Sequence, residues 1–193
     1  MSILEKEDER KNILTILKNT HKALQTEDAV LLREMSDRTV HSASIYKDPD
    51  SVAIAVTVYV LSKIIERKDY KENKQWPSFF NKIIKDIDRA TIHLEKNEIK
   101  EFRVAMHDIR RATSQLSGHL KNYIQDVFRK AQINKASRLY EHGISMAETA
   151  ELLDITTWEL AEYIGMTGIS DVDLSITLPI KERINFTKKL FES

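Results

Sequence analysis

Only four glycines and three prolines are spread over the 193 residues of this chain. These two residue types most destabilise the interior of a helix, whereas turn-rich β folds depend on them. Their scarcity therefore favours long helices. Charged residues make up 31% of the chain and apolar residues 41%, a balance that suits helices with one buried and one solvated face. The sequence predicts an all-α protein.

Helices are predicted wherever apolar residues recur at helical spacing, first over 3–19 and 26–46. The second should end before Asp48-Pro49, and Asp50 or Ser51 can cap the next. Residues 52–65 are ambiguous, because VAIAVTVYV also alternates as a strand does. A helix is favoured because the run continues at helical spacing and no comparable strand lies nearby to pair with it. Further helices are expected over 77–96 and from Leu178 to the end of the chain.

A long helix is predicted to begin near Glu98, because its apolar residues recur every seven positions in two columns. Such a repeat is typical of a seam packed at a shallow angle against other helices. Gly118 lies within the predicted helix. A glycine lowers the stability of a helix by about 1 kcal/mol, which need not break it. The first column holds Phe102, Ile109, Leu116 and Tyr123, and the second holds Met106, Thr113, Leu120 and Val127.

Two capping boxes stand in tandem within residues 143–168. Ser145 and Glu148 are spaced to open one helix, and Thr156 and Glu159 are spaced to open the next. In each box the two side chains offer partners to the first free amides of the helix. The segment is therefore predicted to form a helix, a short turn and a second helix. The inward face of the pair is expected to comprise Thr149, Leu153, Ile155, Leu160 and Tyr163.

The turn of this motif is expected at Asp154, which can adopt a left-handed conformation. Ala150 stands where the two helices approach most closely, and Gly165 is expected to end the second helix. With these features the segment resembles the helix-turn-helix of DNA-binding regulators, and ISMAETAELLDITTWEL also resembles small prokaryotic helix-turn-helix antitoxins. The resemblance implies a regulator that acts as a dimer. The predicted organisation is a helical bundle over 1–125, joined by a long helix to a helix-turn-helix domain over 126–193.

The charges are unevenly distributed, although the net charge is zero. Residues 102–140 hold eight Lys or Arg and two acids, whereas residues 141–173 hold eight acids and no Lys or Arg. Nucleic acids are bound mainly by cations that neutralise phosphates, and the second helix of the motif has none. The basic stretch can supply them, since Arg103, Arg110, Lys121 and Lys135 share a narrow arc of an ideal helix. Alternatively, these are solvated charges paired with acids of neighbouring helices.

The favoured hypothesis is a non-enzymatic helix-turn-helix regulator, a homodimer that binds nucleic acid mainly through the basic helix. The alternative is an antitoxin-like or adaptor protein that binds a protein partner through the acidic face of the motif. Trp158 is the candidate anchor for such a contact, unless it belongs to the core of a variant packing. The candidate nucleic-acid-binding residues are Arg103, Arg110, Lys121, Arg129, Lys130, Lys135, Arg138, Thr156 and Thr157.

Catalytic chemistry is not indicated. The six histidines show no metal-binding spacing, and no Gly-rich phosphate loop is present, so no cofactor is expected. Asp37 and His41 lie one helical turn apart and can form a local pair. Arg103 and His107 resemble the Arg/His pair of small helical ribonucleases, but with three intervening residues where that pattern has four to six. The chain has no cysteine, and its longest apolar run, 52–65, is too short to span a membrane, so a cytoplasmic protein is expected.

Overall fold

The computed structural model describes residue 4 and residues 6–67 and 71–167, which form eight α-helices and no strand. The all-α prediction is therefore confirmed. No helix of this part of the chain is long and apolar enough to cross a membrane. The helices are α1 (Glu7–Gln25), α2 (Ala29–Tyr46), α3 (Pro49–Arg67), α4 (Trp76–Glu95), α5 (Ile99–Ser114), α6 (Gly118–Glu141), α7 (Met146–Leu153) and α8 (Thr157–Thr167).

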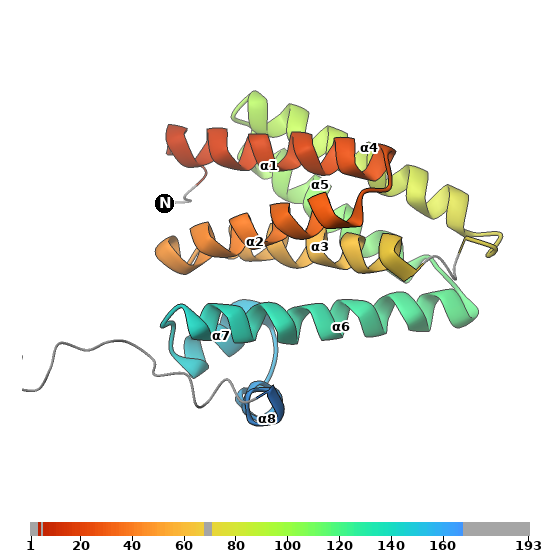
Figure 1. Ribbon diagram of the computed structural model, residues 1–193. Coiled ribbons are helices and arrows are strands. Elements are labelled where there is room, and N and C mark those ends of the chain that lie inside the picture. The colour runs from red at the N-terminus through yellow and green to blue at the C-terminus, as the bar shows by residue number, and fades with distance from the viewer. Residues whose placement is uncertain (1–3, 5, 68–70, 168–193) are drawn as a thin grey trace, which may run out of the picture.

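The helices lie in three tiers (Figure 1). The upper tier is formed by α1 and α4, the middle tier by α2 and α3, and α6 runs along the lower side with α7 and α8 beyond it. From the end of α4, α5 descends behind α3 toward the start of α6. Consecutive helices pair as hairpins, α2 with α3 and α4 with α5, because their connections are only a few residues long. One contiguous cluster of buried apolar side chains extends from Leu4 to Ile164. The last helices thus share the core of the first.

The ambiguous stretch 52–65 is helical and lies within α3, so the strand alternative is wrong. Its β-branched side chains are buried on several sides because α3 packs against both α2 and α6. Tertiary packing thus outweighs their modest helix propensity. The cap differs from expectation, because the Asp48 carboxylate accepts from the backbone N–H (2.9 Å) and hydroxyl (3.1 Å) of Ser51. Asp50 instead binds Arg103.

The single long helix predicted from Glu98 is wrong, because α5 ends at Ser114 and α6 begins at Gly118. Gly118 has φ +60, a left-handed angle that glycine adopts without strain. The connection is fixed by Gln75, whose side chain accepts from Ser117 N at 3.1 Å and donates to Ser117 Oγ at 2.8 Å. The two seven-residue columns are thus divided between two helices.

The lower tier is organised by α6, which packs against α3 and also carries α7 and α8. Residue 125, the predicted domain boundary, lies inside this helix, and the two-domain division stays a prediction. The final helix expected from Leu178 lies outside the described residues. Boundaries elsewhere differ by a few residues: the first helix was expected over 3–19 and spans 7–25, and the second was expected over 26–46 and spans 29–46.

Candidate functional site

The predicted helix, turn and helix are present as α7 and α8. Ser145 Oγ accepts from the backbone N–H of Glu148 at 3.2 Å and so caps α7. The box of α8 is complete: Thr156 Oγ1 accepts from Glu159 N at 3.1 Å, and the Glu159 carboxylate accepts from Thr156 N at 2.9 Å. Asp154 occupies the turn with φ 53 and ψ 48, the left-handed conformation expected there.

The inward face of the motif is close to the prediction. Thr149, Ala150, Leu153 and Leu160 are buried, and Ile155 lies at the edge of the buried class. In α8, Ile164 is buried where Tyr163 was expected, and Tyr163 is half-buried. Gly165 does not end the helix, because α8 continues to Thr167.

Three polar side chains of α6 hold α7 and α8 in place. Gln132 Nε2 donates to the carbonyl of Leu153 at 3.0 Å, and Arg129 Nη1 donates to the carbonyl of Asp154 at 3.2 Å. These bonds satisfy two carbonyls at the end of α7 that have no partner within the helix. Asn134 Nδ2 donates to the Tyr163 hydroxyl at 3.3 Å. The motif is therefore attached to α6 through its turn and through α8.

A further contact connects the motif to the middle tier. Lys47, the left-handed residue that ends α2, donates from its ammonium group to the carboxylate of Glu148 at 2.8 Å. This pair joins residues 101 positions apart in the chain. Sequence patterns did not predict it, because Glu148 was expected to complete its own capping box.

The predicted basic stripe does not form. The helix that was to carry it is divided before Gly118, and Lys135 is buried, with 2% of its surface exposed. Lys135 Nζ donates to the Asp37 carboxylate at 2.8 Å and lies 4.2 Å from the centre of the Tyr59 ring. Burial lowers the pKa of Lys135, and the bond to Asp37 opposes this effect without cancelling it. Lys135 therefore lies inside the structure, where it cannot contact a phosphate backbone.

Four of the other six basic candidates bind acids of the chain: two bind acids of neighbouring helices, as the alternative interpretation proposed, and two bind acids within α6. Arg103, on α5, donates to both carboxylate oxygens of Asp50, and its Nη2 lies 2.7 Å from Asp50 Oδ2. Lys121 is half-buried near the start of α6, and Arg110 lies exposed on α5 beside a cavity described below. The remaining pairs are Arg129 with Glu159, Lys130 with Asp126 at 2.9 Å and Arg138 with Glu141 at 3.0 Å.

Glu159 has the most perturbed carboxyl group of the motif. The backbone and side chain of Thr156 donate to it, as does the guanidinium of Arg129, and together they lower the pKa of Glu159 from 4.5 to about 2. Hydrogen bonds to the ionised form cause this shift. The negative charge of Glu159 thus serves the cap of α8 and its attachment to α6.

Trp158 is not a core residue. It follows Thr157 in the first turn of α8, and 78% of its surface is exposed. Met166, two helical turns further on, is 75% exposed. Glu162 is exposed between them, and Ala161 is half-buried. We call the outward side chains Trp158, Ala161, Glu162 and Met166 the α8 face.

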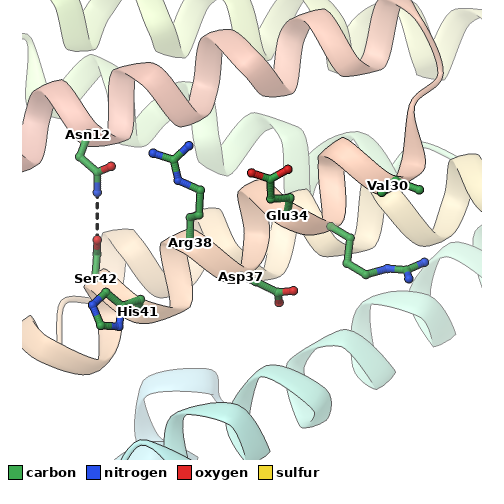
Figure 2. A pocket seen from close by; sticks show the side chains of 8 residues that line it. Asn12, Val30, Glu34, Asp37, Arg38, His41 and Ser42 are labelled. Atoms are coloured by element: carbon green, nitrogen blue, oxygen red, sulfur yellow. Dashed lines mark hydrogen bonds between the residues drawn. The ribbon is translucent and has the colours of Figure 1, made fainter.

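A polar groove lies along α2 beside α1, with a volume of about 740 Å³ (Figure 2). Asn12 Nδ2 donates to Ser42 Oγ at 3.0 Å across one end of it. Asp37 points toward α6, where it binds Lys135, and not toward His41 as the sequence suggested. Arg33 donates to Glu66 at 2.8 Å. These charged groups join helices, and they do not converge on a common point.

A second cavity, of about 400 Å³, opens between α3, α5, α6 and the turn that follows α7. Its floor is apolar, and cationic side chains of α5 line one side. We call it the α3–α5–α6 cavity. Its apolar lining includes Val52, Val56, Met106, Phe128 and Leu152, and its polar lining includes Asp50, Arg103, His107, Arg110, Gln132 and Asp154.

Within residues 6–67 and 71–167, no group of three or more His, Asp or Glu side chains is arranged to hold a metal ion. Comparisons of the chain with protein-family models, with curated proteins and with solved structures gave no significant match.

Proposed function

We propose that this protein acts by binding another protein through the α8 face. The observation that carries the proposal is the 78% exposure of Trp158 on a helix that has no Lys or Arg. Tryptophan is the residue most enriched among those that dominate protein interfaces. Met166 extends the apolar surface, since residues at positions i, i+4 and i+8 of a helix share one side. This is the geometry of an anchor with a flexible apolar neighbour.

The charge of α7 and α8 indicates the chemistry of the partner. Residues 146–167 hold five acids and no Lys or Arg. Glu148 forms an ion pair with Lys47, and Glu159 forms one with Arg129. Glu151 and Glu162 are exposed. Charge complementarity therefore favours a protein with an apolar recess bordered by Lys or Arg.

The same charges argue against two other occupants. Phosphates would meet carboxylates on α8, and five of the cations that were expected to compensate, Arg103, Arg129, Lys130, Lys135 and Arg138, form ion pairs within this chain. A second copy related by twofold symmetry would bring the acids of one α8 against those of the other. A basic protein partner avoids both conflicts.

Capture by the immobilised full chain, followed by binding measurements with the purified captured protein, tests the proposal. Trp158→Ala should weaken binding by about thirtyfold or more, as expected for loss of an interface anchor. Glu162→Lys should weaken it as well, and added salt should slow association. The matched controls are Val104→Ala, at a 59% exposed position of α5, and Glu101→Lys, an exposed acid of the same helix.

The outcome that overturns the proposal is binding of the purified protein that is equal for the wild-type chain and the Trp158→Ala variant. Salt-sensitive binding of random duplex DNA that Trp158→Ala abolishes would also overturn it, in favour of nucleic acid. Concentration-dependent shielding of Trp158 in the protein alone would overturn it in favour of a second copy.

A further inference from the structure

The α3–α5–α6 cavity has the size and lining of a small-molecule site. Its volume of about 400 Å³ falls at the lower end of the range typical for bound ligands. Val52, Val56 and Met106 form buried parts of its lining, and Phe128 and Leu152 are half-buried. Such a surface gains free energy when an apolar group displaces water from it. The thioether of Met106 and the ring of Phe128 favour an aromatic group, because both pack well against aromatic rings.

The cationic side chains of α5 that line this cavity already have partners. Arg103 binds Asp50, and Arg110 also has an interaction partner within the chain. An anionic ligand would therefore leave water without gaining a counter-charge of its own, and a cationic ligand would lie beside two guanidinium groups. The lining thus favours a neutral molecule.

Gln132, which lies half-buried on α6, supplies this lining with a hydrogen-bond acceptor. Its Nε2 donates to the carbonyl of Leu153 at 3.0 Å, and this bond sets the orientation of the amide. In the part of the chain that the structure describes, no group donates to Gln132 Oε1. An amide oxygen accepts hydrogen bonds and cannot donate them. A ligand that meets it must therefore present an N–H or O–H group.

We propose that this cavity binds a small neutral aromatic molecule with one N–H or O–H donor, of the indole or phenol class. The ring lies on the apolar floor, and the donor meets Oε1 of Gln132. This inference does not depend on the proposed protein partner.

The opposite wall of the cavity gives such a ligand a structural consequence. Leu152, Leu153 and Asp154 belong to the end of α7 and to the turn before α8. A bound molecule contacts α3 and α5 on one side and this turn on the other. Because a ligand stabilises the arrangement that it contacts, occupancy favours the docked position of α7 and α8.

Titration of the full chain with indole tests the site, with benzofuran as the matched ligand. The two molecules have nearly the same shape, but benzofuran carries a ring oxygen where indole carries N–H. The methyl resonance of Met106 and the heat of binding are the two measurements. Indole should shift the Met106 resonance and bind about fivefold or more tightly than benzofuran, as expected for one additional hydrogen bond. Burial of apolar surface alone predicts the opposite order, because benzofuran is the less polar molecule.

Gln132→Leu should abolish this preference, so that the two affinities agree within about twofold. The matched control is Asn134→Leu, because Asn134 is another amide of α6 that binds the motif, but it does not line the cavity. The control should keep the preference of the wild-type protein. The ratio of the two affinities is compared because a change in packing weakens both ligands alike.

Equal affinity for indole and benzofuran in the wild-type protein would overturn the donor assignment, whether or not the Gln132 variant folds. Indole carboxylate should bind more weakly than indole, and tighter binding would overturn the assignment of a neutral ligand. An unchanged Met106 resonance at millimolar indole would overturn the site itself.

Discussion

The ammonium group of Lys135 lies 2.8 Å from the carboxylate of Asp37, and this bond joins α6 to α2. Lys135 is buried, whereas the side chain of Asp37 is 60% exposed. The pair is therefore asymmetric: water can solvate Asp37 if it loses its partner, but it cannot reach Lys135. A residue that the sequence placed on an outer basic stripe thus stabilises the contact between two tiers of helices.

Replacement of the two partners should therefore have unequal effects. Asp37→Asn leaves a buried ammonium group without its counter-charge and should lower the free energy of unfolding by about 1–3 kcal/mol. Lys135→Met keeps the apolar stem, places a thioether beside the Tyr59 ring and should change it by less than about 1 kcal/mol. Urea unfolding of both variants at pH 7 measures the difference. A larger loss for Lys135→Met than for Asp37→Asn would contradict this account.

The lowered pKa of Lys135 also predicts a dependence of stability on pH. Between this pKa and the usual 10.5, the unfolded chain binds more protons than the folded protein at this position. The contribution of this group to stability therefore rises with pH through that interval and is complete above 10.5. Unfolding measured from pH 8 upward should show a steeper rise for the wild-type protein than for Lys135→Met. Parallel curves of stability against pH for the two proteins would show that the pKa of Lys135 is not lowered.

Two glycines should respond in opposite directions to substitution by alanine. Gly165 lies inside α8, and a Cβ added there meets nothing within 4 Å. Gly165→Ala should therefore stabilise the protein by about 0.5–1 kcal/mol. Gly118 has equal space but φ +60, so Gly118→Ala should destabilise it by about 1–2 kcal/mol. The unfolding temperatures of the two variants measure these effects. A stabilising effect of Gly118→Ala would mean that α5 and α6 form one helix.

The pKa of Glu159, about 2, predicts a loss of stability in acid. Because the pKa of Glu159 in the folded protein lies below the usual 4.5, its carboxylate stabilises the folded state fully above pH 4.5. This stabilisation is lost as the pH falls toward 2. Carboxyl-detected NMR should show the low midpoint in the wild-type protein and a higher one in Arg129→Gln. Glu159→Gln should flatten the acid limb of thermal unfolding more than the control Glu162→Gln does. A Glu159 midpoint near 4.5 would contradict the observed hydrogen bonds.

The two tryptophans should differ sharply in their access to solvent. Trp76 is 6% exposed and stacks on Phe80 with ring centres 5.1 Å apart, whereas Trp158 is 78% exposed. Iodide should therefore quench most of the fluorescence of Trp76→Phe and little of that of Trp158→Phe. A protected Trp158 in dilute full-length protein would mean that another part of the chain covers the α8 face.

Local signals in the sequence predicted most of the helices, as well as the two helices and the turn at Asp154 in the motif, but not the end of its second helix. Capping boxes, the helical spacing of apolar residues and the Asp48-Pro49 stop each act over a few residues, so they can be recognised without the fold. The predictions that were wrong concern helix ends and side-chain burial, which depend on contacts between residues far apart in the sequence. The chain turns between α5 and α6, and α6 begins at Gly118, because Gln75, 42 positions before Ser117, fixes Ser117 in the connection.

The candidate site shows the same limit. The exposure of Trp158 agreed with one of two alternatives in the sequence, because an aromatic residue beside a capping box can face either way. Lys135 was misplaced for a different reason. A helical wheel places its side chain correctly on the helix, but only the packing of α2 and α3 reveals that this side is covered.

The central claim, that the α8 face meets a basic and apolar surface, is tested most directly by the emission of Trp158 in the Trp76→Phe protein. The titrants are a helical peptide of Lys and Leu and, separately, a random DNA duplex. The account predicts a blue shift and protection from iodide with the peptide, both weakened by salt and by Glu162→Lys, and no change with the duplex. A response of Trp158 to the duplex but not to the peptide would contradict it.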